Sequence, residues 1–130
     1  MAIAIVIVLV GLAVGSFLNV CIDRLPAGES PFGPRSHCAA CKTLLAPRDL
    51  VPVASYLLLR GKCRYCAAPI PIRVPLVEAG TGGLFLILWW RYGRAPETAL
   101  LALIVSALVV IGVIGWESRT VAGTSKEKPQ

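Results

Sequence analysis

Four cysteines form two Cys-x-x-Cys pairs separated by 21 residues: Cys38, Cys41, Cys63 and Cys66. Two such pairs can bind one tetrahedral metal ion through four thiolates, and Zn²⁺ is the usual occupant. Four protein ligands close the coordination sphere, so we expect a structural metal with no open position for a catalytic water. Disulfides and a redox-active dithiol are the alternatives. The adjacent His37 is a further candidate ligand, although a solvated neighbour of the site is the simpler interpretation.

The remaining sequence is typical of a membrane protein, since 56% of the 130 residues are hydrophobic and 15% are charged. Residues 2–22 and 98–116 are uncharged runs that are long enough to cross a bilayer. Residues 74–92 are less clearly apolar because they include Glu78 and Arg91, but we interpret them as another span. The first run lacks the basic start of a signal peptide and is interpreted as an anchor. We therefore predict an all-α membrane protein with about three transmembrane helices.

The basic residues predict the orientation of these spans. Eight Lys or Arg residues fall in the loop at 23–73, three follow residue 116, and two, Arg91 and Arg94, lie where the second span ends and the third has yet to begin. This asymmetry predicts a cytoplasmic loop and tail. Thiols stay reduced in the cytoplasm, which favours a metal over disulfides. The net charge of +6 is explained by topology and by attraction to anionic membrane lipid, so no nucleic-acid partner is expected.

These features predict one membrane domain at 1–116, with its zinc-binding loop at 23–73, followed by a polar, disordered tail at 117–130. Within the loop we expect a short helix. Asp49 is suited to be its N-cap, and Gly61 is suited to be its left-handed C-cap.

Four segments, in this order, resemble the N-terminal part of the bacterial prepilin peptidases. They are "GSFLNVCIDRLP" (15–26), the two cysteine pairs, "DLVPVASYLLLRGKCRYC" (49–66) and "IRVPLVEAGTG" (72–82). These peptidases are the bifunctional leader peptidases and N-methyltransferases of type IV pili and type II secretion. The resemblance implies a multi-pass protein of the bacterial inner membrane with a zinc-bound cytoplasmic loop. It also implies cleavage of prepilin leaders by aspartic-protease chemistry, and methylation of the new amine with S-adenosylmethionine.

The aspartate pair that the resemblance requires is absent from this sequence. Gly115 stands where the first catalytic aspartate would be, and the second belongs to a later segment. Glu117 and Glu78 have no carboxylate partner at a convincing spacing. We therefore expect no peptidase activity from this polypeptide alone, and a separate peptidase half is a candidate partner.

Two other residues are candidates for methyl transfer or substrate binding. The resemblance associates methylation with a glycine two positions before the third cysteine, which is Gly61 here, although a helix C-cap is a sufficient explanation of this glycine. Glu78 at the edge of a span could attract the basic leader or the free amine of a prepilin, or could be a simple interfacial anchor that faces water or pairs with Arg73 or another base. No Gly-rich Rossmann-type segment is present, so the residues that would bind a methyl donor are unassigned.

We therefore interpret the chain as a prepilin peptidase-like N-terminal domain, limited to binding a type IV prepilin or pseudopilin or to methyl transfer. The alternative is a non-catalytic membrane zinc module that recruits a pilus or secretion partner. Methyl transfer to a pre-cleaved pilin would distinguish the two functions.

Overall fold

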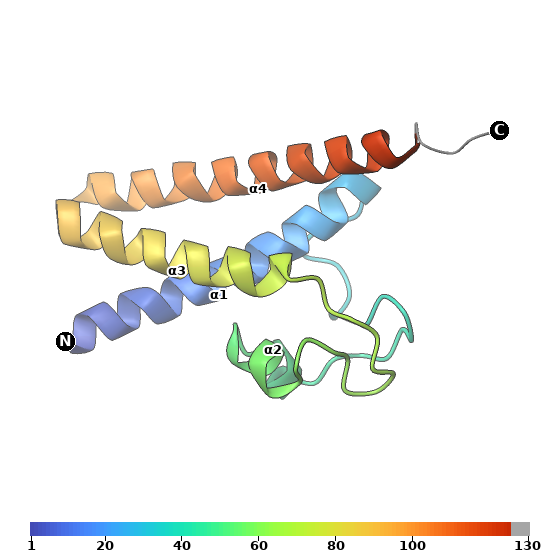
Figure 1. The fold of residues 1–130 in the computed structure, drawn as a ribbon. Coiled ribbons are helices and arrows are strands. Elements are labelled where there is room, and N and C mark those ends of the chain that lie inside the picture. The colour runs from blue at the N-terminus through green and yellow to red at the C-terminus, as the bar shows by residue number, and fades with distance from the viewer. Residues whose placement is uncertain (126–130) are drawn as a thin grey trace.

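The computed structural model describes residues 1–125, and three long helices dominate it (Figure 1). They are α1 (Ala2–Arg24), α3 (Arg73–Tyr92) and α4 (Pro96–Ser125). The loop between α1 and α3 contains three short helices, η1 (Leu25–Ala27), η2 (Pro47–Leu50) and α2 (Ala54–Leu58). Residues 1–125 contain no β-strand beyond two isolated bridges, so the all-α prediction is confirmed, with the four cysteines between the first and second long helices.

Two helical segments are long and apolar enough to cross a membrane, Ala2–Ala27 and Pro96–Gly123. A helix in lipid satisfies its backbone hydrogen bonds internally, which is why an uncharged apolar run adopts this structure. The 20 residues of α3 also have the length required, because 1.5 Å per residue gives about 30 Å. However, α3 carries Arg73, Glu78 and Arg91. The membrane span predicted at 74–92 therefore stays a prediction.

Helix α4 continues beyond the expected boundary at residue 116 and ends at Ser125. The prediction of a disordered tail is therefore wrong for residues 117–125, which are helical. Extending an existing helix fixes few dihedral angles for each hydrogen bond gained, so a polar sequence can continue a helix that an apolar one began. Residues 126–130 of the predicted tail lie outside the described part of the chain.

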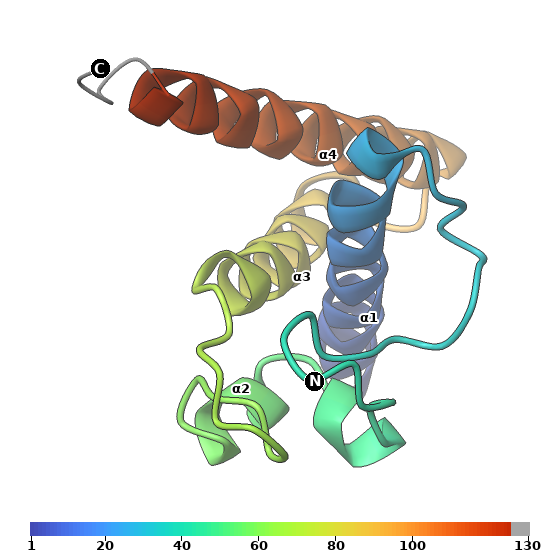
Figure 2. The ribbon, with the colours of Figure 1, turned by 90° about the vertical axis from the view of Figure 1, so that its right-hand side faces the viewer.

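Among the described helices, α1 and α3 make the most extensive contact, and glycines allow their backbones to approach closely. A Cβ atom built on Gly11 would lie 2.7 Å from the Cα of Gly82, and one built on Gly15 would lie 2.7 Å from the Cα of Glu78. The G-x-x-x-G spacing of α1 thus brings the two backbones together. Figure 2 shows α4 lying across this pair. A small core joins all three helices: Leu18, Cys21, Ile22, Val77 and Val110.

The loop helix differs from the prediction. Asp49 does not cap α2, because α2 begins at Ala54 and Asp49 lies inside η2. The two helices are separated at Val53, whose φ of +59° and ψ of −48° break the helical path. Gly61 has the positive φ that was predicted, +71°, but it is not the C-cap, because α2 ends at Leu58 and its C-cap is Leu59.

Candidate metal centre and the adjoining cavity

Each cysteine pair forms the same type of turn. In the first, Cys38 N–H donates to the Thr43 carbonyl and Lys42 N–H donates to the Cys38 carbonyl. The second repeats both bonds at Cys63 and Ala67, and an isolated antiparallel bridge closes each turn. The residue after the second cysteine has a positive φ in both turns, 59° at Lys42 and 58° at Ala67. The two turns therefore present their sulfurs in the same way.

The four sulfur atoms are placed to bind one metal ion. All lie within 4.8 Å of one another, and the Sγ atoms of Cys38 and Cys66 are 3.7 Å apart. A tetrahedral ion with bonds of 2.3 Å to sulfur requires a separation of about 3.8 Å, so the group fits. All five cysteines are free thiols, and the separations exclude a disulfide between them in this structure. A structural metal is thus supported.

The chemistry of this group also favours a metal. The Cys41 sulfur and the Thr43 hydroxyl are 3.3 Å apart, and hydrogen bonds to the side chain and backbone of Thr43 are the main cause that lowers the pKa of Cys41 to about 6. Burial and the neighbouring sulfurs raise the pKa of Cys66 to about 11, so Cys41 is the thiol of this group that ionises more readily. A lower pKa favours the thiolate, which is the form that binds metal. His37 is exposed, pairs with Leu44 through the backbone, and is not part of the group found in residues 1–125.

Asp49 connects the second turn to the middle of the loop. Its carboxylate accepts hydrogen bonds from Arg64 Nε at 2.7 Å, from the Tyr65 hydroxyl at 3.2 Å and from Ala46 N–H at 3.1 Å. Arg64 and Tyr65 are the two residues between the last two cysteines, so Asp49 binds the turn itself. Its side chain is only 2% exposed, and the Arg64 guanidinium holds the pKa of Asp49 below its usual range.

We expect Asp49→Asn to lower metal affinity about tenfold, as is typical when a partner behind a metal ligand is changed. Because the folded-state pKa is depressed, the carboxylate contributes fully above the unfolded value of about 4 and loses its effect only below it. The difference in metal affinity between this variant and the wild-type chain should therefore be constant between about pH 6 and 8. Competition with a chromogenic chelator measures the metal affinity of both proteins. Glu29→Gln, which removes an exposed carboxylate of the same loop, should leave affinity unchanged, and an equal loss there would contradict the role of Asp49.

Glu78 is buried, with 5% exposure, and faces the loop. Its Oε2 atom accepts a hydrogen bond of 2.6 Å from Val53 N–H. Val53 is the centre of a tight turn in which Ala54 N–H donates to the Pro52 carbonyl at 2.5 Å. This γ-turn conformation is rare, and it aims the Val53 N–H at Glu78. Glu78 is thus more than a surface anchor, because it attaches the loop to α3.

A cavity of about 340 Å³ lies between the loop and the α1–α3 pair. Polar groups from four elements line it, with apolar side chains between them: Ser16, Asn19, Asp23, Asp49, Ser55, Tyr56 and Glu78. Gly61 is not among the lining residues. It contacts two residues that do line the cavity. A Cβ on Gly61 would lie 3.0 Å from the hydroxyl of Tyr56, and the Gly61 carbonyl accepts a hydrogen bond of 2.7 Å from Ile70 N–H.

The sequence matches the family model described as the Bacterial Peptidase A24 N-terminal domain, over residues 9–92. The matched region contains both cysteine turns, Asp49 and Glu78, and spans α1 through α3. The chain belongs to this family. The resemblance inferred from its motifs is confirmed.

The curated relatives of this peptidase A24 N-terminal domain are prepilin leader peptidase/N-methyltransferases. The protein of that name from Myxococcus xanthus is 43% identical over 111 residues, covering 85% of this chain and 33% of the relative. The Klebsiella pneumoniae protein is 39% identical, covering 80% and 48%, and the Bacillus subtilis protein is 34% identical, covering 79% and 42%. The chain thus spans between a third and about half of these relatives. No solved structure gave a significant match.

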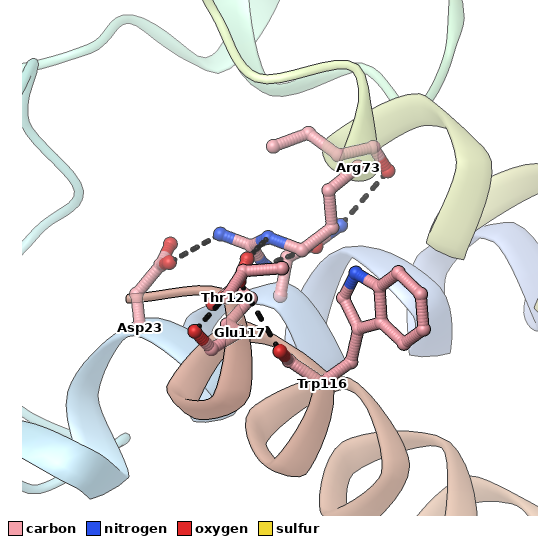
Figure 3. A network of polar contacts seen from close by, with 7 residues as sticks. Asp23, Arg73, Trp116, Glu117 and Thr120 are labelled. Atoms are coloured by element: carbon pink, nitrogen blue, oxygen red, sulfur yellow. Dashed lines mark hydrogen bonds and ion pairs between the residues drawn. The ribbon is translucent and has the colours of Figure 1, made fainter. Parts of the chain in front are cut away.

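A charged junction joins the three long helices, including α4, which lies beyond the residues matched by the family model (Figure 3). Arg73 of α3 forms ion pairs with Asp23 of α1 at 2.5 Å and with Glu117 of α4 at 2.6 Å. Its guanidinium also donates to Asn19 Oδ1 at 3.0 Å. The structure thus gives Glu117 a carboxylate neighbour that sequence spacing did not reveal. A guanidinium binds both acids, so they are not a pair of carboxylates sharing one proton, as aspartic-protease chemistry requires.

Sequence reasoning misassigned Asp49, missed Val53 and gave Arg73 a different partner from Asp23 and Glu117. Asp49 followed by a proline near a helix start has the pattern of an N-cap, and that local pattern obscured its bond to Arg64. The arginine and tyrosine inside the last Cys-x-x-Cys were the available signal, since side chains at these positions need a partner.

Gly115 lies within α4, with no heavy atom within 4 Å of its Cβ position.

Proposed function

We propose that this chain binds S-adenosylmethionine and the free amine of a pilin, and serves N-methylation rather than leader cleavage. The observation that carries this proposal is the cavity beside the metal centre, in which the carboxylate of Glu78 is buried. A volume of about 340 Å³ is within the range of small-molecule sites, which is about 300–1,000 Å³. Both ligands are cationic at neutral pH, one at its sulfonium and the other at its ammonium group. A buried carboxylate favours either charge.

S-adenosylmethionine would supply an electrophilic methyl group. Glu78 would accept a hydrogen bond from the pilin amine and take its proton, because an amine attacks through its free lone pair. The bond from Val53 N–H occupies part of one carboxylate oxygen, and an ionised carboxylate has about four acceptor positions. The carboxylate can therefore stay anchored to the loop while it binds an amine. Asp23 and Asp49 also line the cavity, but each forms an ion pair with an arginine, Arg73 and Arg64 respectively. Among the described residues that line it, Glu78 is therefore the carboxylate without a basic partner.

The cysteine group would bind Zn²⁺ as a structural ion, because four thiolates with tetrahedral spacing are its usual site. The distribution of basic residues supports a bacterial inner-membrane location with the cysteine loop in the cytoplasm. The partner would be a type IV prepilin or a pseudopilin, and leader cleavage would require an aspartate pair outside these 130 residues. The relatives' names supply the substrate class.

The test uses the whole chain in lipid nanodiscs, loaded with one zinc per chain. Saturable binding of radiolabelled S-adenosylmethionine, followed by label transfer to a pilin whose leader has already been removed, would support the proposal. Zinc loading without donor binding or transfer would reject it and favour the non-catalytic recruiting module.

We expect Glu78→Gln to lower methyl transfer about 100-fold, in the range lost when a catalytic proton acceptor is removed. Glutamine can still accept the bond from Val53 N–H, so metal content should stay at one per chain. Glu97→Gln, in the first turn of α4, is the matched control and should retain wild-type activity. Full activity of the Glu78 variant would show that another group takes the proton.

A further inference from the structure

The loop that carries the cysteine turns does not extend away from the long helices. It folds back beside them, and its tip reaches α3 at the bond between Val53 N–H and Glu78. Figure 1 shows α2 below α1 and α3; along the length of α1 it lies between the two ends of that helix. Glu78 lies five residues after Arg73, or about 7.5 Å along the helix at 1.5 Å per residue. The backbone at Gly15, opposite Glu78, lies nine residues before Arg24, or about 13 Å along α1.

The tip therefore lies beside the apolar part of a candidate membrane span, Ala2–Ala27. Residues 50–59, "LVPVASYLLL", contain no charged side chain. Tyr56 faces inward, since its ring lies against Gly61 and it lines the cavity. Leu57 and Leu58 face outward, with exposures of 67% and 81%, and Val51 is also exposed. Large exposed apolar side chains at this level need an apolar environment.

Basic residues follow the apolar tip directly, at Arg60 and Lys62. Both are exposed. Long basic side chains at this position can extend to lipid headgroups while the adjacent leucines enter the acyl region, and anionic lipids add about 1 kcal/mol per basic residue at the surface. This combination of an apolar face and neighbouring bases is typical of segments that lie in a membrane interface.

We propose that the tip formed by Val51 to Leu58 inserts into the lipid bilayer beside α3. Leu57 and Leu58 contact acyl chains, Arg60 and Lys62 contact headgroups, and the opposite side of α2 forms a wall of the cavity. The cavity then opens at the boundary between lipid and water. This inference does not depend on the proposed function, because it requires no ligand in the cavity.

The test uses the unmodified chain in bilayers that contain a lipid with a diazirine on its acyl chain. After illumination, trypsin cleavage at Lys42, Arg48 and Arg60 releases residues 43–48 and 49–60 as separate peptides. We expect lipid adducts on 49–60 at a level at least several-fold above those on 43–48. Peptide 43–48 is the matched control, because its Leu44 is 54% exposed but lies in a cysteine turn.

Hydroxyl-radical labelling of the same samples gives the opposite readout and should modify Leu44 more than Leu57 and Leu58. Strong radical labelling of both leucines, without lipid adducts, would place the tip in water and overturn the proposal. Protection from both reagents would also overturn it, in favour of a protein partner on this face. Because no residue is changed, misfolding of a variant cannot explain any of these results.

Discussion

Replacing Cys63 by serine should abolish tight metal binding. Cys63 is a buried member of the four-sulfur group, and no other described cysteine or histidine lies within that group to replace it. We expect metal content to fall from one per chain to less than about a tenth, because structural zinc binding is worth about 10–16 kcal/mol in small zinc domains and depends on all four ligands. Elemental analysis of detergent-purified protein measures this directly.

Loss of the metal should also make the loop easier to cleave at positions away from the cysteines. Without it, the second turn no longer holds Arg64 and Tyr65 against Asp49, and the segment leading to Val53 loses its support. Trypsin should then cleave at Arg48 and Arg60 at least tenfold faster than in the wild-type chain. A chelator that removes the metal from the wild-type protein should give the same cleavage pattern.

Cys21→Ala is the control for the Cys63 variant. Cys21 is the fifth cysteine, and it is buried in the helical core beside Leu18 and Ile22. This variant should keep one metal per chain and wild-type resistance to trypsin in the loop. A Cys63 variant that still bound one metal would show that three sulfurs suffice or that another group replaces the fourth.

The metal centre was the part of the site that the sequence predicted best, and the reason is its locality. Each pair of ligands lies within four consecutive residues, and a Cys-x-x-Cys turn positions its two sulfurs by backbone hydrogen bonds inside the same turn. Spacing therefore contains most of the geometric information. The helices α1 and α4 were predicted for a similar reason, since an uncharged apolar run in a membrane has few structures available to it.

The polar connections could not be predicted because they join residues that are far apart in the chain. Val53 and Glu78 are separated by 25 positions, and Arg73 and Asp23 by 50. Sequence reasoning offered Arg73 as a partner for Glu78, since both lie near the start of the same helix. In the structure Arg73 instead binds Asp23 and Glu117, and Glu78 faces the loop. Which way a helix rotates decides such pairings, and packing against α1 sets that rotation.

Gly15→Leu should separate α1 from α3. Even the first side-chain atom would lie 2.7 Å from the Cα of Glu78 and 3.1 Å from the Val77 carbonyl oxygen. Both neighbours are backbone atoms, which cannot move aside as the end of a side chain can. We expect a loss of about 3 kcal/mol or more in the free energy of unfolding, at the upper end of what overpacking costs. Titration with a denaturing detergent, followed by circular dichroism, measures this loss.

Gly83→Leu is the matched control, because a Cβ atom there meets no heavy atom within 4 Å. It adds the same side chain to an exposed position of α3 and should change stability by less than about 0.5 kcal/mol. Equal losses in the two variants would show that the close approach at Gly15 is not what holds the helices together.

The Gly15 variant also separates two roles of α3. The hydrogen bonds of each cysteine turn join residues within 36–45 or 61–70, so metal content should survive the displacement of α3. Glu78 should not retain its place, because its backbone is what the new side chain would push away. A chain that holds its metal but loses methyl transfer would therefore locate the chemistry at the contact between loop and helix, and not at the metal centre.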